Sequence, residues 1–211
     1  MSTYKNTISK KGKVYEIYHT RNPVLLFLRK KFLNKTAYLL QYINAASLKG
    51  LDIGCSEGHM MNILSEKGVI NDITGVDLDK ERIDLAKKQY PALDFQVGDI
   101  YDLKSSTEIY DYIIATEILE HLPDPEAALT MLRSVAEHNS YIIISVPNEP
   151  YFSIGNCMRG KYWHRRGRTP AHVNFWSRKQ FKIFLQQNHI DIVKQYSLST
   201  FPWLLYLGKF K

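Results

Sequence analysis

The sequence predicts an α/β fold: a doubly wound, mostly parallel sheet of seven strands with helices on both faces and an extra N-terminal helix. From residue 49 onward, short apolar segments alternate with amphipathic ones, which is the order of a parallel sheet with crossover helices. Residues 112–115 and 142–146 are continuous apolar or nearly apolar runs, as expected of central strands that are covered on both faces.

Each element follows from its own pattern of apolar residues. The predicted strands are residues 50–53, 73–76, 94–97, 112–116, 141–146, 190–196 and 203–210, of which the last two are expected to form an edge hairpin. The predicted helices are residues 23–44, 58–67, 80–89, 125–138 and 178–188. Asn22 and Ser177 are expected to cap the first and last helix. Residues 147–173 show little periodicity and are predicted to form a long functional loop.

Composition and charge narrow the class of protein. A hydrophobic content of 45% and a charged content of 23% are typical of a soluble globular chain, and the apolar runs are too short to span a bilayer. The polar N-terminus has no signal-peptide core, and Cys55 and Cys157 do not suggest a disulfide framework, so we expect a reduced, cytoplasmic setting. The net charge of +7 is concentrated in the first 35 residues and in residues 159–168. This distribution indicates attraction to an anionic partner, although the N-terminal lysines by themselves fit a solvated surface.

Acidic residues stand at the ends of four successive predicted strands. The first strand leads into Asp52 and a turn bounded by Gly54 and Gly58, which lets a ligand approach the backbone beside a helix N-terminus. Asp77 ends the second strand, where a carboxylate can accept hydrogen bonds from ribose hydroxyls. Asp99 follows the third strand, where it can accept from an adenine amino group, and Glu117 follows the fourth.

In combination these motifs resemble the class I S-adenosylmethionine-dependent methyltransferases, in the group that includes the ubiquinone-biosynthesis O-methyltransferases. Residues 52–58 resemble their first motif, 98–100 the adenine-contacting motif, 110–125 the fourth motif and 146–148 the end of the fifth strand. The resemblance covers residues 49–196. It implies a Rossmann-like fold, S-adenosyl-L-methionine (SAM) as methyl donor and S-adenosyl-L-homocysteine (SAH) as product. The cofactor-binding residues that it implies are Asp52, Gly54, Cys55, Ser56, Gly58, Asp77, Leu78, Asp99, Ile100, Thr116 and Glu117.

One position departs from the family pattern. Ser56 stands where the family usually has glycine, and we therefore expect an ordinary negative φ at this residue.

A second group of residues points to the chemical step. In the ubiquinone-biosynthesis enzymes and in the enzymes that 2′-O-methylate the 3′ ends of small RNAs, a Glu-x-x-Glu-His segment and a later histidine hold a divalent metal. The matching positions are Glu117, Glu120, His121 and His172. Relatives with the same Glu-His-Leu-Pro segment have no known metal, and there the histidine orients a loop or acts as a base. The alternative to a metal site is therefore that His121 or His172 acts as a general base. We assign the two histidines as catalytic and leave the metal as the alternative.

The resemblance implies one methyltransferase domain over residues 1–211. It divides into an N-terminal arm and helix (1–45), a cofactor-binding core (49–148), a basic and aromatic insertion on the acceptor side (149–175), and a C-terminal helix and strands (176–211). We expect O-methylation of a small-molecule, sugar or lipid-linked acceptor. The basic N-terminal helix is expected either to pack on its own domain or to make peripheral contact with an anionic membrane surface. One alternative is a 2′-O RNA methyltransferase whose basic loop binds phosphates, although we favour nucleic acid less than a small-molecule or lipid-linked acceptor as the partner. The other alternative is a non-catalytic cofactor-binding protein.

Overall fold

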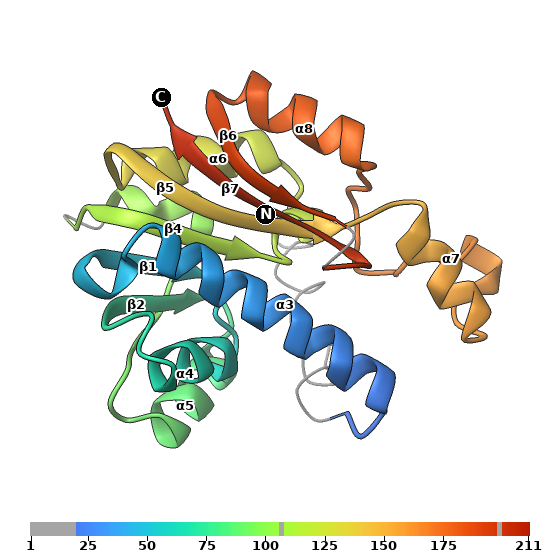
Figure 1. The fold of residues 1–211 in the computed structure, drawn as a ribbon, viewed down its shortest axis with the longest axis horizontal. Helices are drawn as coiled ribbons and strands as arrows, with labels where there is room; N and C mark the ends of the chain where they lie inside the picture. The colour runs from blue at the N-terminus through green and yellow to red at the C-terminus, as the bar shows by residue number, and fades with distance from the viewer. Residues whose placement is uncertain (1–19, 106–107, 198–199) are drawn as a thin grey trace.

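The computed structural model describes residues 20–105, 108–197 and 200–211. Its seven-stranded sheet has the strand order β3-β2-β1-β4-β5-β7-β6 (Figure 1). The strands are β1 (Lys49–Ile53), β2 (Asp72–Asp77), β3 (Asp94–Val97), β4 (Tyr110–Thr116), β5 (Ala136–Pro147), β6 (Ile190–Tyr196) and β7 (Trp203–Phe210). The first five strands are parallel, and β7 runs antiparallel to both β5 and β6. The predicted doubly wound sheet with a C-terminal edge hairpin is confirmed.

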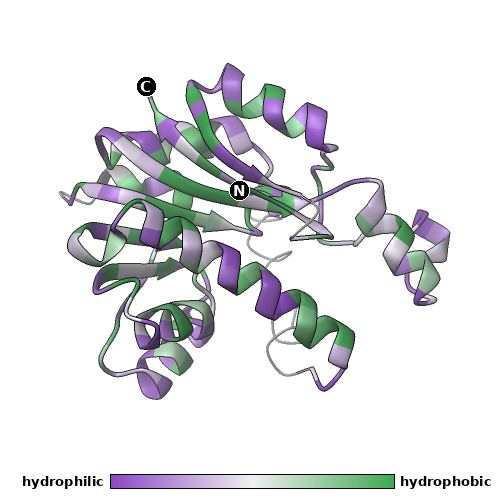
Figure 2. Cartoon of the chain, in the orientation of Figure 1, coloured by the Kyte–Doolittle hydropathy of each residue, from purple (hydrophilic) through white to green (hydrophobic). Residues whose placement is uncertain are grey.

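Helices cover both faces of this sheet (Figure 1). They are α3 (Pro23–Tyr42), α4 (His59–Glu66), α5 (Lys80–Gln89), α6 (Pro125–Ser134), α7 (Tyr151–Met158) and α8 (Arg178–Gln187). One apolar core joins α3, α4 and α5 to the sheet, and a second joins α6 and α8 to the opposite face. The hydropathy colours of Figure 2 follow this division, with apolar residues along the central strands. Among the described residues, no helix combines the length and apolar character needed to cross a membrane.

Short-range signals in the sequence set the helix ends. Asn22 Oδ1 accepts from the backbone N–H groups of Val24 and Leu25, and Pro23 occupies the first helical turn. Ser177 and Gln180 form a reciprocal capping box at the start of α8. Both predicted caps are confirmed.

Two predicted boundaries are wrong. The helix expected over residues 125–138 ends at Ser134, because Ala136 already pairs with Tyr110 of β4 and begins β5. The loop expected over residues 147–173 contains α7 and the short 3₁₀ helix Trp163–Arg165. The buried positions of α7 are Ser153 and Asn156, so this helix carries no inward-facing apolar stripe that a sequence pattern could reveal.

The glycine that opens α4 is required by packing, which gives a testable difference in stability. Gly58 has a φ of 74°, and a Cβ there would lie 2.5 Å from the ring of Phe95. We expect Gly58→Ala to lower the free energy of unfolding by about 3 kcal/mol, since steric overlap adds to the cost of a left-handed backbone. Gly68 has a similar φ of 66°, and a Cβ added there would meet no other atom within 4 Å, so Gly68→Ala is the matched control. Gly68→Ala should lower the free energy of unfolding by only about 1 kcal/mol, as measured by urea titration of both variants.

Candidate functional site

The loop after β1 folds back tightly on the end of β2. The backbone N–H groups of Gly54 and Cys55 both donate to the carbonyl oxygen of Val76, at 2.7 and 3.2 Å. Gly54 and Ser56 have φ values of 80° and 53°, so both lie in the left-handed region. The loop is therefore attached to the strand that ends in Asp77.

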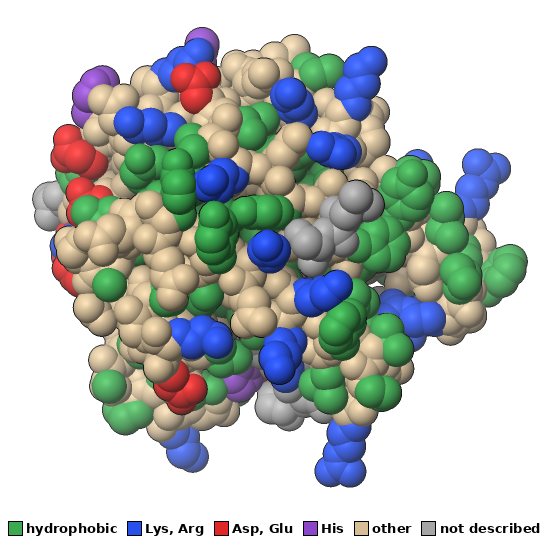
Figure 3. Space-filling view, viewed as in Figure 1, with side chains coloured by type: hydrophobic (Ala, Val, Ile, Leu, Met, Phe, Trp, Pro, Cys, Tyr) green, Lys and Arg blue, Asp and Glu red, His purple; other side chains and the backbone are tan. Residues whose placement is uncertain are grey.

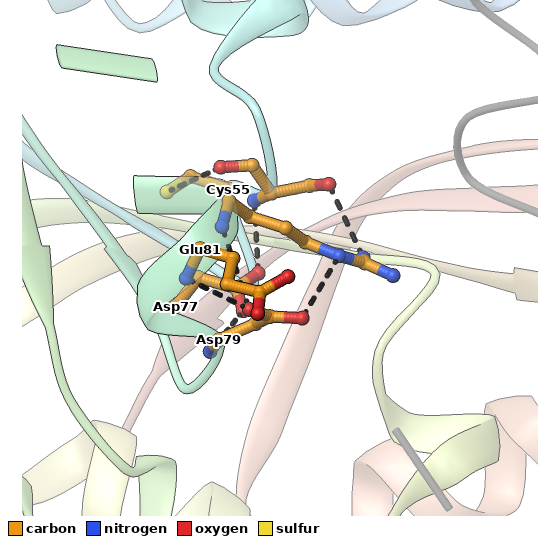
Figure 4. Close-up of polar contacts among 6 residues, drawn as sticks. Cys55, Asp77, Asp79 and Glu81 are labelled. Carbon is orange, nitrogen blue, oxygen red and sulfur yellow. Dashed lines mark hydrogen bonds and ion pairs between the residues drawn. The ribbon is translucent and has the colours of Figure 1, made fainter. Parts of the chain in front are cut away.

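The expectation of an ordinary φ at Ser56 is wrong, and the contacts of this residue explain why. Its backbone N–H donates to Asp77 Oδ2 at 2.9 Å, and its hydroxyl accepts from Arg82 Nη1 at 3.3 Å (Figure 4). These two contacts hold the backbone in a conformation that glycine adopts at little cost. The same arginine pairs with Asp79, with 3.4 Å between Nε and Oδ2.

Asp77 is fixed by the backbone around it. Its Oδ1 accepts from the N–H of Asp79 at 2.9 Å, while Oδ2 accepts from Ser56 (Figure 4). Burial raises the pKa of Asp77, and these backbone donors and the charge of Arg82 partly offset that rise. Each oxygen keeps a further lone pair, so the carboxylate can still accept hydrogen bonds from a ligand.

Asp52 is a buried acid at the end of β1. Its side chain is 1% exposed, and Oδ2 has no hydrogen-bond partner within the described part of the chain. Burial raises its pKa to about 8, and the neighbouring charge of Asp77 adds to the effect. Burial also raises the pKa of the Cys55 thiol, so this cysteine is protonated at neutral pH and is not a nucleophile.

One cavity of about 480 Å³ brings the predicted residues together. All the predicted cofactor-binding residues except Gly58 line it, and so do both predicted catalytic histidines. Gly58 instead packs against Phe95. A volume in this range is typical of small-molecule sites.

Sequence reasoning missed several residues of this lining. Arg82, Glu57, His59 and Met60 also line the cavity. His59 lies between Glu57 and Tyr90, with its ring nitrogens 3.2 Å from Glu57 Oε2 and 2.7 Å from the Tyr90 hydroxyl. The signal for Arg82 was available, because an arginine three residues after the Asp79 cap points back toward the preceding loop.

Glu117 follows β4 and faces the same cavity. Its φ is 56°, and its backbone N–H lies 3.2 Å from both the carbonyl and the hydroxyl oxygen of Ser145. The Ser145 hydroxyl donates to Glu117 Oε1 at 2.9 Å. Burial raises the pKa of Glu117 to about 8, and the hydrogen bond from Ser145 opposes this rise.

The segment after the insertion is attached to the turn that follows β4. Asn174 Nδ2 donates to the carbonyl oxygens of Leu119 and Leu122, and the backbone N–H of Val173 donates to the carbonyl of Glu120 at 2.8 Å. These contacts carry His172 to His121, whose ring centroid lies 4.9 Å away. Two segments that are about fifty residues apart in the chain thus form one site.

Glu120, His121 and His172 form a cluster whose ligand atoms all lie within 4.8 Å of one another. Ala171 offers a carbonyl oxygen 2.9 Å from His121 Nδ1, so Nδ1 must carry the proton and Nε2 keeps its lone pair. Burial lowers the pKa of His121, whereas burial and Glu117 raise that of Glu120. Glu120 Oε2 is buried without a hydrogen-bond partner in the described residues. One carboxylate and two imidazoles suit a divalent transition metal. Glu117 lies outside this group.

Comparison with known proteins agrees with this fold. A family model described as "Methyltransferase domain" matches residues 24–195. The ubiquinone biosynthesis O-methyltransferase of Coxiella burnetii is 29% identical over 137 residues, which are 63% of this chain and 53% of that protein. The chain thus aligns with about half the length of this relative.

Two solved structures share the architecture. The plantazolicin methyltransferase BpumL, in complex with a triazolic desmethylPZN analog and SAH, has a TM-score of 0.73 at 19% identity and covers 99% of this chain and 95% of its own. The magnesium protoporphyrin IX methyltransferase of Synechocystis PCC 6803, with bound SAH, has a TM-score of 0.66 at 15% identity, covering 100% and 94%. Because the family model spans most of the sequence, the chain belongs to the family of methyltransferase domains.

Proposed function

We propose that the protein is a SAM-dependent methyltransferase that methylates a hydroxyl oxygen of a small-molecule or lipid-linked acceptor. The observation that carries this proposal is the shared cavity: residues 54–57 of the loop and Asp77 line the same cavity as His121 and His172. Family membership and the neighbours with bound SAH support the choice of cofactor.

On the cofactor side, the chemistry of the lining fits SAM. Asp77 would accept from the ribose hydroxyls, and Asp99 from the adenine amino group. Asp52 and Glu57 supply acidic groups beside a ligand that carries a sulfonium and an ammonium cation. The unpartnered Asp52 Oδ2 is a buried acceptor of the kind that a bound cation or donor satisfies. When bound, SAM supplies an electrophilic methyl group.

On the acceptor side, His121 is the proposed base. Its protonated Nδ1 is held by Ala171, so Nε2 is free of a proton and its lowered pKa keeps it neutral. In the proposed step, Nε2 takes the proton of the acceptor hydroxyl. At the same time the acceptor oxygen forms a bond to the methyl carbon, and the bond between that carbon and the sulfonium sulfur breaks. Orientation in a water-poor cavity supplies most of the acceleration.

The acceptor itself is proposed to join an apolar part to an anionic group. The cavity is lined by the apolar side chains of Leu25, Leu28 and Phe152 as well as by Arg29 and Arg159. The relative from Coxiella burnetii is named for ubiquinone biosynthesis, which is compatible with a lipid-linked acceptor.

The proposal is tested by incubating the protein with SAM labelled on its methyl group and pools of lipid, sugar and RNA, with and without divalent metal. Mass detection of label in a lipid or small-molecule fraction is the expected result. Label in RNA would instead assign the RNA alternative. SAH binding by calorimetry without label in any pool would leave a cofactor-binding protein and overturn the enzymatic proposal.

Binding of SAM should depend on pH through Asp52. Below its pKa of about 8 the carboxyl is protonated in the free protein, and a cationic ligand favours the ionised form, so binding releases a proton. Affinity should therefore rise by up to about tenfold per pH unit between pH 6 and 8 and level off above that. Calorimetry in buffers of different ionisation enthalpy measures the released proton.

Asp52→Asn is the control, because it removes the titrating group while SAM's own amino group still titrates. The affinity of this variant for SAM should therefore change less with pH than that of the wild type, by the contribution of this one proton. Identical profiles for the two proteins would contradict the assignment.

A further inference from the structure

Helix α7 buries two polar residues beside the half-buried Phe152, and it exposes an apolar side. Ser153 and Asn156 are buried, where Asn156 Nδ2 donates to the carbonyl of Gly167 and to the Thr169 hydroxyl, at 2.9 and 3.3 Å. Tyr151, Ile154 and Met158 are 55%, 51% and 83% exposed. A helix that packs only on its own domain shows the opposite arrangement. The spacing of these three residues puts them on one side of the helix.

The first turns of α3 present a similar surface next to the same cavity. Val24 and Phe27 are 61% and 57% exposed, and Trp163 in the turn after α7 is 69% exposed. We call these six residues the apolar rim: Val24, Phe27, Tyr151, Ile154, Met158 and Trp163. Figure 3 shows hydrophobic side chains gathered at the side of the molecule where α7 and the start of α3 lie. Val24 and Tyr151 belong to the rim and also line the cavity, so the rim adjoins the cavity.

Positive charge accompanies the rim without any negative charge in the same segments. The sequence has no Asp or Glu between residues 17 and 51, or between residues 150 and 190. Arg29, Arg159 and Lys161 line the cavity beside the rim, and the side chain of Lys31 lies over the ring of Phe27 at 4.7 Å. Exposed apolar groups interleaved with cations match the interface of an anionic bilayer, where the apolar groups insert and the cations meet lipid phosphates.

We propose that the apolar rim docks on an anionic lipid bilayer and opens the cavity toward it, so that the acceptor passes from the membrane into the site. This deepens the proposed function and rests on it for the acceptor's passage. A second copy of the chain is a poorer occupant, because an isologous contact would bring the same cations face to face. An uncharged or basic protein surface is disfavoured for the same reason.

The test is co-sedimentation of the full chain with vesicles of phosphatidylcholine alone or mixed with phosphatidylglycerol. The wild type should bind the mixed vesicles at least about tenfold more tightly than the neutral ones, and high salt should weaken this binding. The double variant Ile154→Ser, Met158→Ser should bind the mixed vesicles at least about tenfold more weakly. In the wild type, both apolar side chains move from water into the bilayer on docking, and serine does not gain from this transfer.

The matched control is Leu85→Ser, Ile183→Ser, which removes two apolar residues of 43% and 42% exposure on α5 and α8. It should bind vesicles as the wild type does. SAH calorimetry on every variant tests the proposed function separately and shows that each variant is folded. Absence of binding to mixed vesicles by a protein that binds SAH overturns the docking proposal, as does equal loss in both double variants. A dimer that dissociates in the Ile154→Ser, Met158→Ser variant would also overturn it.

Discussion

Replacing Asp77 with alanine is expected to weaken the binding of SAM and SAH about a thousandfold. The change would remove the two charge-assisted hydrogen bonds that we propose Asp77 accepts from the ribose, each worth about 2 kcal/mol, and each 1.4 kcal/mol corresponds to about a tenfold change in affinity. It also removes the acceptor for the N–H of Ser56, which holds the left-handed turn of the loop. Titration calorimetry with SAH measures the effect without knowledge of the acceptor.

Two further variants separate the loss of the ribose contacts from a general loss of structure. Asp77→Asn keeps the side-chain volume and one acceptor oxygen, so its affinity should lie between that of the wild type and that of the alanine variant. Asp84 lies on the exposed side of α5, where it accepts from Lys80 at 2.6 Å, so Asp84→Ala should leave affinity unchanged. An Asp77→Ala protein that is folded and binds SAH as tightly as the wild type would refute the ribose assignment.

The core of the fold was predictable because its signals are local. The buried runs of β4 and β5, the caps Asn22 and Ser177, and the strand–turn–helix at Gly54 all depend on residues near one another in the chain. Parallel strands then place their carboxyl ends at one edge of the sheet, which explains why Asp52, Asp77 and Asp99 reach one cavity.

The features that sequence reasoning missed depend on distant contacts. Ser56 adopts a left-handed backbone because Asp77 and Arg82 hold it, and both lie more than twenty residues away. The start of β5 at Ala136 depends on pairing with Tyr110. Helix α7 escaped detection because Tyr151, Ile154 and Met158 face outward and only Phe152 among its large apolar residues packs against the core. Local periodicity reports burial within the domain and carries no information about a surface that is apolar for another reason.

The largest effect on the acceptor side is expected from the cluster of Glu120, His121 and His172. If these side chains hold a divalent cation, the protein should bind Co²⁺ or Zn²⁺ at this cluster, and His172→Ala should weaken that binding about a thousandfold. Loss of an outer-shell partner alone costs about ten- to a hundredfold in metal affinity, and a direct ligand contributes more. Visible absorption during a Co²⁺ titration, or the rise in unfolding temperature on adding Zn²⁺, measures the site without an acceptor.

The same variants distinguish the metal from the base. His138 is exposed on β5, so His138→Ala should bind metal as the wild type does. If the wild type and His172→Ala respond equally to Co²⁺, the cluster holds no metal, and His121 acts as a base whose neutral Nε2 is set by Ala171. Methyl transfer should then persist in a chelator and fall as the pH drops through the pKa of His121, which burial holds below its ordinary value. A metal site predicts loss of transfer in the chelator at every pH, because the cation supplies the charge that activates the acceptor hydroxyl.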